Sequence, residues 1–479
     1  MEGIAVDLKE LNAKHKDYAS NVKTWEYLQA SYAGGEEYRK AALLYKYVFE
    51  ETDDEKFKQR LDQTPLDNKC ESTIHTYSSF IWKQAPQRDL GRLEKNLEAL
   101  QMLEDADMDE TPLNEFMREV QIAAGIFGHC WIVMDKSSEK VGNLRQARSM
   151  GIRPYLSLYI PVDVWDWRFE RNAAGRFELT YIKYVEEETD AEGQTFQIFR
   201  IWNMDSFEVY RVQAGKGDDA IELIDSGSNE LGMVPAVCHV NKKSRVRGIG
   251  ISDIKDVAKM QQGIYNDLSE LAQTIRNTNH STLVKNEKDS AVGGAGGVIV
   301  MDDDTEAAKK PYLLQPHLFQ MEGLLKAIEK KENMINTMTH LLPVRQVRTQ
   351  PASGVAIQTE FQLLNSLLAE KAASLQMTEY RLVRIFCAWI GKDANRMWVV
   401  ISYPTKFELR DRESDLRVIE QAKKLRVKSS TYYQELDKMV ANITLEDDTN
   451  IESIHKEIES TEYEVVEEED VRDAGSQAE

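Results

Sequence analysis

The sequence lacks the features of several protein classes. None of its 479 residues belongs to an apolar run approaching the roughly 18 residues that a membrane-spanning helix needs. Bases are in deficit, with 60 lysines and arginines against 81 acids and a net charge of −21. Because binding nucleic acid without sequence preference requires bases that neutralise phosphates, this charge argues against a protein that grips nucleic acid through a basic face. The polar N-terminus of mixed charge is not typical of a secretory signal.

Residue patterns that carry catalysis or metal binding are missing too. The sequence contains no Walker-A motif, no GxSxG elbow and no HExxH pair. Its four cysteines, at 70, 130, 238 and 387, include no CxxC pair, which predicts reduced thiols in an intracellular protein and no disulfide framework. Asp302–Asp304 with Glu306 could hold a divalent ion, but a solvated turn is the commoner role of such a run. We therefore predict no enzymatic activity, no cofactor and no metal.

The acidic charge is concentrated at the C-terminal end. Residues 446–479 contain 14 acids and two bases, so more than half of the net charge lies in this segment. Segments of such composition bury too little apolar surface to fold, so we predict an acidic, disordered tail.

Hydrophobic periodicity predicts a helical region over about the first 125 residues. Apolar residues recur at helical spacing over 18–28 and again over 38–48, with a break at Gly34–Gly35. Another helix is expected to begin after Pro112 and to end at Gly125.

From about residue 128 the period changes to that of strands. A short apolar run at 128–135 predicts a buried strand, and β-branched and aromatic runs over 154–226 predict an antiparallel meander that 231–241 closes. Acidic neighbours favour strand packing over base stacking for the aromatic residues of this region. They are Tyr155, Tyr159, Trp165, Trp167, Tyr181, Tyr184 and Trp202.

Two long helices with a small β unit between them are expected next. An apolar stripe runs over about 25 residues after Ser252, a candidate N-cap with Asp253 and Asp256 in the first turn. Residues 277–316 read as a compact β insertion, and a second helical stripe extends from Leu318 to about residue 340.

A loop and a third helix follow. The loop between Pro343 and Pro351 carries two arginines and no acid. The helical stripe that begins at Ser353 lasts for roughly 36 residues, or about 50 Å. Because ordinary globular helices have about 11–12 residues, we expect another subunit to cover its apolar face. A strand at 397–404 and two helices over 411–443 complete the pattern.

The bases are few and local. Four lie within 242–248, Lys326, Lys330 and Lys331 lie about one helical turn apart, and Arg345 and Arg348 lie in the loop. In an acidic chain these are the places where a polyanion would be touched lightly. Solvated surfaces or ion pairs between subunits are the alternative roles.

Four local strings follow one another in a distinctive order. They are SYAGGEEYRKA, LGMVPAVCHVNKK, RGIGISDIKDVAKMQQGIYNDLSEL and ASGVAIQTEFQLLNSLLAEKAASLQMTEYRLVRIF. They resemble, in turn, the aromatic-glycine N-terminal segment, the strand before the stem, the entry to the first stem helix and the long helix after the tunnel loop of the portal proteins of tailed bacteriophages. The similarity covers about residues 20–445, and the order of the strings makes it specific.

The resemblance implies an α+β fold in a ring, typically of twelve subunits, at one capsid vertex of a virion assembled in the bacterial cytoplasm. Double-stranded DNA would be packaged and ejected through the ring with low affinity, and no membrane would be involved. The implied parts are the wing at 1–250 (helical to about 125, then β-rich), stem helices at 251–277 and 316–341, the clip at 278–315, the tunnel loop at 342–353, the long wing helix and a strand at 354–410, and the crown at 411–445. The tail at 446–479 has no counterpart.

The same resemblance supplies the candidate site residues. Those expected to face the channel and its DNA are Arg345, Gln346, Arg348, Gln350, Lys326 and Lys330. Those expected in the clip, where terminase and later the head–tail adaptor would dock, are Lys285, Asn286, Glu287, Lys288, Asp302, Asp303 and Asp304. Major capsid and scaffolding proteins are the other implied partners.

Two alternatives from other classes stay open. An intracellular enzyme could use an unrecognised site around 165–210, although the missing motifs and the length of the helices argue against it. A helical adaptor or scaffold protein would explain the helices but not the β insertion between two of them.

Overall fold

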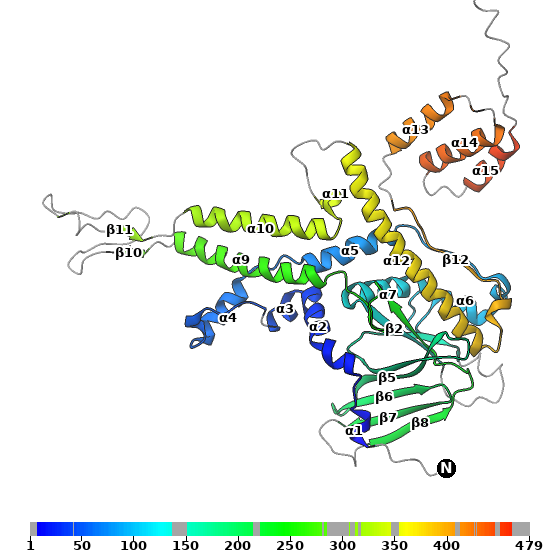
Figure 1. Cartoon of the computed structure of the whole chain (residues 1–479), viewed down its shortest axis with the longest axis horizontal. Helices are drawn as coiled ribbons and strands as arrows, with labels where there is room; N and C mark the ends of the chain where they lie inside the picture. Colours follow the sequence, from blue (N-terminus) through cyan, green and yellow to red (C-terminus); the bar gives the residue numbers. More distant parts are fainter. Residues whose placement is uncertain are drawn as a thin grey trace, which may run out of the picture. The chain divides into compact units, whose positions relative to one another are not determined.

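The computed structural model describes residues 7–41, 43–136, 151–213, 221–279, 282–284, 306, 312–314, 318–345, 354–407, 412–425, 427, 429–445 and 451–461. They belong to two units, Met1–Phe407 and Glu408–Glu479. The first combines helices and sheets and the second is helical, which confirms the α+β class (Figure 1). None of the described helices is both long and apolar enough to cross a membrane.

Short helices build the N-terminal region. They are α1 (Leu8–Leu11), α2 (Lys16–Ala33), α3 (Gly35–Lys40), η1 (Val48–Glu50), α4 (Asp54–Gln63), α5 (Lys69–Ile81), η2 (Gly91–Leu93), α6 (Leu97–Glu104) and α7 (Leu113–Phe127). Side-chain caps fix several starts: Asp53, Asn68 and Asn96 each accept a hydrogen bond from the backbone N–H three residues on. α7 begins directly after Pro112, as predicted.

The helix predicted over 38–48 is wrong beyond Lys40. Tyr45 is 66% exposed and Val48 83% exposed, so neither belongs to a buried stripe. Here the backbone bonds to side chains of another helix instead. Gln262 Nε2 donates to the Leu43 carbonyl at 3.2 Å, and the Tyr45 N–H donates to Asn266 Oδ1 at 2.8 Å. The periodicity could not reveal these long-range partners.

Two sheets form the β-rich region. The larger confirms the predicted antiparallel meander from residue 164 on, while the first predicted run, at 155–159, belongs to the other sheet. Its strands are β4 (Val164–Arg171), β5 (Phe177–Thr189), β6 (Thr195–Asn203), β7 (Ser206–Gln213) and β8 (Ile221–Ser228), in sequence order. The smaller sheet has β2 (His129–Asp135) between β3 (Tyr155–Tyr159) and β9 (Ala236–Val240). The prediction that 231–241 closes the meander is therefore wrong. β2 is buried along almost all of its length, so it needs a neighbour on each edge, and β3 and β9 supply them.

The predicted order of helix, β unit and helix is confirmed. α9 (Lys255–Asn279) and α10 (Leu318–Met338) lie side by side, and β10 (Thr282–Val284) pairs antiparallel with β11 (Tyr312–Leu314) between them in the chain (Figure 1). α9 begins a few residues after the predicted start. The Ser252 hydroxyl accepts the N–H of Ile254 at 3.1 Å and so precedes the helix.

The third long helix, α12 (Gly354–Trp389), has the predicted 36 residues and follows the short α11 (Leu342–Arg345). After it come η5 (Ala394–Arg396) and β12 (Val400–Ser402), which pairs with β1 (Gln87–Asp89). The expectation that another subunit covers the apolar stripe of α12 is wrong for most of its length. Leu368, Leu375 and Phe386 are buried in a core that α7, β2 and β12 of the same unit share.

The described residues of the C-terminal unit form the helices α13 (Arg412–Lys424), α14 (Ser430–Thr444) and α15 (Ile451–Ser460). α15 corrects the prediction of a disordered tail at 446–479, because Lys438 on α14 bonds Glu459 at 2.9 Å and Gln434 Nε2 donates to its carbonyl at 3.2 Å. Isoleucines at 451, 454 and 458 give this acidic stretch a helical stripe, which the overall composition concealed. The rest of the tail lies outside the described residues.

Candidate functional site

Lys326 and Lys330, two of the predicted channel-facing residues, lie exposed on α10. Neither forms an ion pair with the residues that the structure describes. Their neighbour Lys331 differs, because it bonds Asp267 on α9 at 2.5 Å and the Gly263 carbonyl at 3.4 Å. Lys331 therefore fastens α10 to α9, whereas Lys326 and Lys330 are available to another molecule.

Arg345 ends α11 and is half-buried. Its Nη2 donates to Ser72 Oγ on α5 at 2.7 Å and its Nη1 to Asn336 Oδ1 on α10 at 3.4 Å. Burial lowers the pKa of Arg345, which the charges of Tyr77 and Asp67 oppose. The first residues of the predicted tunnel loop are thus a helical turn held against two helices.

The other predicted site residues fall outside the described residues. They are Gln346, Arg348, Gln350, Lys285, Asn286, Glu287, Lys288, Asp302, Asp303 and Asp304. Their roles stay predictions.

A buried ion cluster lies where α9 begins, and we call it the junction: Asn241, Lys242, Asp253 and Lys371. Asp253 is 2% exposed and pairs with Lys371 on α12, which is 3% exposed, and its Oδ1 lies 3.2 Å from Lys242 Nζ. Lys371 Nζ also donates to Asn241 Oδ1 at 2.5 Å. Burial opposes charge on Asp253, but the two lysines outweigh it and lower the pKa of this carboxyl. The junction binds α9, α12 and the segment after β9 together.

Two neutral histidines adjoin the junction. His239 Nδ1 lies 2.8 Å from Thr378 Oγ1 on α12, and His129 Nδ1 accepts the Gly250 N–H at 3.4 Å. Burial lowers the pKa of each imidazole to about 3. Both rings are therefore uncharged near neutral pH.

Sequence reasoning missed the junction. It assigned Asp253 to the helix dipole and did not single out Lys371. One signal was available, because Lys371 lies seven residues after Leu364 and so shares the apolar stripe of α12. A lysine within such a stripe requires a buried acidic partner.

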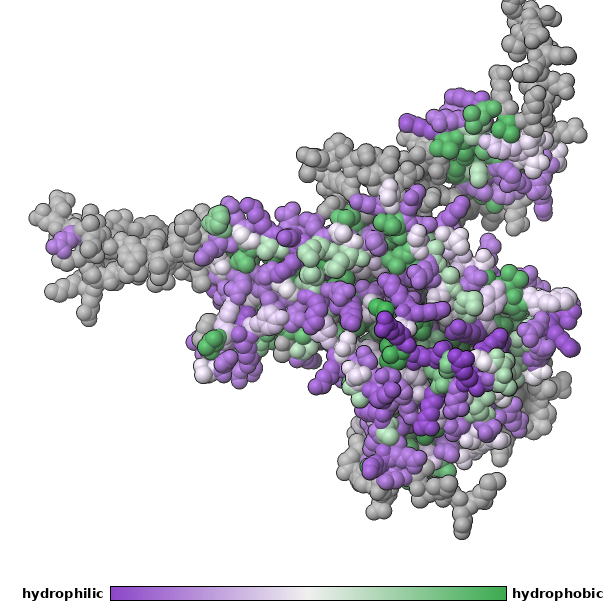
Figure 2. All heavy atoms as spheres, in the orientation of Figure 1, coloured by the Kyte–Doolittle hydropathy of each residue, from purple (hydrophilic) through white to green (hydrophobic). Residues whose placement is uncertain are grey.

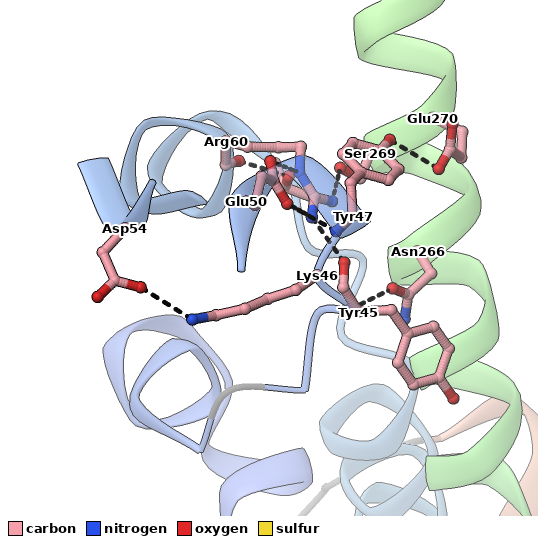
Figure 3. A network of polar contacts seen from close by, with 10 residues as sticks. Tyr45, Lys46, Tyr47, Glu50, Asp54, Arg60, Asn266, Ser269 and Glu270 are labelled. Atoms are coloured by element: carbon pink, nitrogen blue, oxygen red, sulfur yellow. Dashed lines mark hydrogen bonds and ion pairs between the residues drawn. The ribbon is translucent and has the colours of Figure 1, made fainter. Parts of the chain in front are cut away.

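A second polar network fastens residues 43–63, which we call the clamp, to α9 (Figure 3). Arg60 donates from Nε to Glu50 Oε1 at 2.7 Å, from Nη2 to the Tyr45 carbonyl at 2.6 Å and from Nη1 to Ser269 Oγ on α9 at 3.0 Å. Both Arg60 and Glu50 are almost fully buried. The hydrogen bonds from Arg60 lower the pKa of Glu50.

The clamp and α10 use different sides of α9. The clamp is bonded to Gln262, Asn266, Ser269 and Glu270, whereas α10 is bonded to Gly263 and Asp267. At about 100° per residue the centres of the two groups lie about a quarter-turn apart around the helix. Figure 1 shows α4 and α10 on opposite sides of α9.

The β-rich region offers less to a ligand. Trp167, Tyr184 and Trp202 are buried in one core, which confirms the packing role predicted for the aromatic residues of the strands. Within the described residues no three His, Cys, Asp or Glu side chains are grouped so that they could hold a metal. All four cysteines are free thiols.

Comparison with known proteins gives weak matches. No family model and no curated protein matches the chain. A solved chain from the neck of an empty GTA particle, computed with C6 symmetry, is similar at 10% identity and a TM-score of 0.44, over 77% of this chain and 89% of that one. A chain from the virion of a native gene transfer agent particle is similar at 10% identity and a TM-score of 0.41, over the same shares. TM-scores this low carry no argument about function.

Proposed function

We propose that the protein is a portal subunit, which forms a ring at one vertex of a phage capsid and lets double-stranded DNA pass during packaging and ejection. The observation that carries the proposal is the hairpin of α9, β10–β11 and α10, followed directly by α11 and the 36-residue α12. This order supports the assignment of stem, clip, tunnel loop and wing helix that the sequence resemblance implies.

The surface of the hairpin supports a ring. Phe319 is 76% exposed, and Ile275, Leu325, Met334 and Met338 are also exposed on α9 and α10. Figure 2 shows green, apolar side chains among hydrophilic ones over these helices. Neighbouring copies that pack side by side would remove this apolar surface from water.

The charge of the chain suits DNA passage. A net charge of −21 repels phosphate, so DNA would slide rather than bind, while Arg345, Gln346, Arg348 and Gln350 in 342–353 would touch it at the constriction. Lys326 and Lys330 fit either of two roles, contact with DNA or contact with a neighbouring copy.

The remaining assignments concern partners. Residues 278–315 would present Lys285–Lys288 and Asp302–Asp304 to the packaging terminase and later to the head–tail adaptor. Major capsid and scaffolding proteins would surround the ring at the vertex.

Electron microscopy of the purified full-length protein tests the proposal. We expect closed rings with a central channel and, in particles that carry Arg348→Glu, intact rings with altered DNA packaging. A monodisperse monomer under assembly conditions would overturn the proposal. Normal packaging by Arg348→Glu rings would remove this arginine from the DNA path.

A further inference from the structure

The outer face of α10 combines apolar and basic residues. Lys326 and Lys330 lie within about 20° of Phe319 around the helix, whereas the buried Ile328 and Ile335 lie on the opposite side, against α9. A partner of this face must therefore offer apolar surface together with acids.

The clamp has the matching chemistry. Tyr45 and Val48 are its exposed apolar residues. Glu51 and Glu55 are exposed, and neither forms an ion pair among the described residues. The nearby Asp53 and Asp54 differ, because they are paired with Lys56 and Lys46 at 3.0 Å each.

The clamp presents this surface rigidly. The Arg60–Glu50 pair lies beneath it, and Tyr47 OH donates to Glu270 on α9 at 2.6 Å (Figure 3). A loop fixed by buried polar bonds loses little conformational entropy when its exposed side chains bind a partner. Exposure of Val48 therefore does not reflect a loose segment.

We infer that the clamp of one copy packs against the outer face of α10 of the next copy, with Glu51 and Glu55 opposite Lys326 and Lys330. The inference rests on the proposed ring. The clamp and α10 pack on different sides of the same α9, with α4 of the clamp and α10 on either side of it in Figure 1, so we assign the contact to two copies and not to one. Contacts of this kind run head to tail, and they close into a ring where the rotation between copies permits, rather than into a two-fold dimer. They assign Lys326 and Lys330 to the subunit interface and not to DNA.

Charge reversal in the full-length chain tests the contact. The variant Lys326→Glu/Lys330→Glu and the variant Glu51→Lys/Glu55→Lys should each lose rings at low salt, because each places like charges across the interface. All four residues are exposed, so the thermal unfolding of each variant should match that of the natural chain.

Mixing supplies the decisive measurement. The variant Lys326→Glu/Lys330→Glu has an acidic clamp and an acidic α10 face, and the variant Glu51→Lys/Glu55→Lys has a basic clamp and a basic α10 face. In an equimolar mixture, opposite charges meet wherever the two variants alternate. The mixture should therefore form rings that neither variant forms alone. The chain with all four changes should also recover rings. Mass photometry and negative-stain imaging read out the result.

The outcomes separate the inference from the proposed function. Rings in Lys326→Glu/Lys330→Glu would overturn the inference while leaving the portal assignment intact, and lost DNA packaging by those rings would return these lysines to the DNA path. The inference would also be overturned if both charge-reversal variants lost rings and their mixture did not recover them. A natural chain that stays monomeric would instead defeat the proposed function itself.

Discussion

The two ends of α9 are built in contrasting ways. At its start, Asp253 is enclosed by Lys371, Lys242 and Asn241 of the same unit. Farther along, α9 carries the clamp on one side and α10 on another, and both expose apolar residues together with charged residues that form no ion pair within the described ranges. The contacts at the start of α9 are thus all made within one subunit, whereas we assign the surfaces farther along it to contact between subunits. Mutations at the two ends should therefore affect different quantities, namely subunit stability and ring formation.

The largest expected effect comes from removing Lys371. The substitution Lys371→Met strands Asp253 as a buried, poorly compensated carboxylate, which should cost about 3–5 kcal/mol of unfolding free energy. Denaturant unfolding measures this loss, with Lys326→Met as the matched control at an exposed site that should change stability by less than about 0.5 kcal/mol. Adding Asp253→Asn should restore part of the loss. If Lys371→Met and Lys326→Met were equally stable, the junction would not stabilise the subunit more than the exposed lysines of α10 do.

The next effect is a dependence on pH at the junction end. His129 and His239 have folded pKa values of about 3, below the unfolded value of about 6.5, so the unfolded chain binds protons that the folded chain does not. Their contribution to stability is present above pH 6.5 and is lost as the pH falls toward 3, by roughly 2–3 kcal/mol between pH 7 and 5.5. Asp253, whose pKa is lowered, adds a further loss only below about pH 4.

A histidine variant tests whether the buried imidazoles cause this pH dependence. Substituting His239→Gln should halve the pH slope of the unfolding free energy between pH 7 and 5.5, because one of the two titrating imidazoles is gone. Identical slopes in the variant and the natural chain would show that His239 does not contribute to the dependence.

The smallest of the three effects belongs to the clamp. Arg60→Ala leaves Glu50 without its guanidinium, but the clamp can open and let water reach this carboxylate, so we expect about 1–3 kcal/mol. Hydrogen exchange should show the loss over residues 43–63 and not at the junction, since local units open separately. Arg276→Ala, which removes an exposed bond to Gln63, is the control with little effect. Uniformly faster exchange across the first unit would mean that clamp and junction are one cooperative unit.

Patterns of short range were predicted best. The apolar stripes located α9, α10 and α12, and alternating aromatic runs located the meander, because both depend on periods that neighbouring residues repeat. Residues 43–48 at the start of the clamp were mistaken for helix because their backbone is held by Gln262 and Asn266, more than 200 residues away in the chain. The pairing of β9 with β2 was missed for a related reason. The alternation of residues along β9 predicts a strand, but it does not show which other strand β9 pairs with.

Residue spacing alone was enough to establish the order of helix, β unit, helix and long helix, and the absence of the Walker-A, GxSxG and HExxH motifs. Only the tertiary structure decided which charged side chains form ion pairs inside the subunit. Lys331 and Lys371 form ion pairs within it, whereas Lys326 and Lys330 form none with any residue that the structure describes. All four are lysines on helices, so their spacing could not separate them. Burial and the position of a partner carboxylate separate them. Removing an ammonium group from water costs free energy, and only a carboxylate that is already in place compensates this cost.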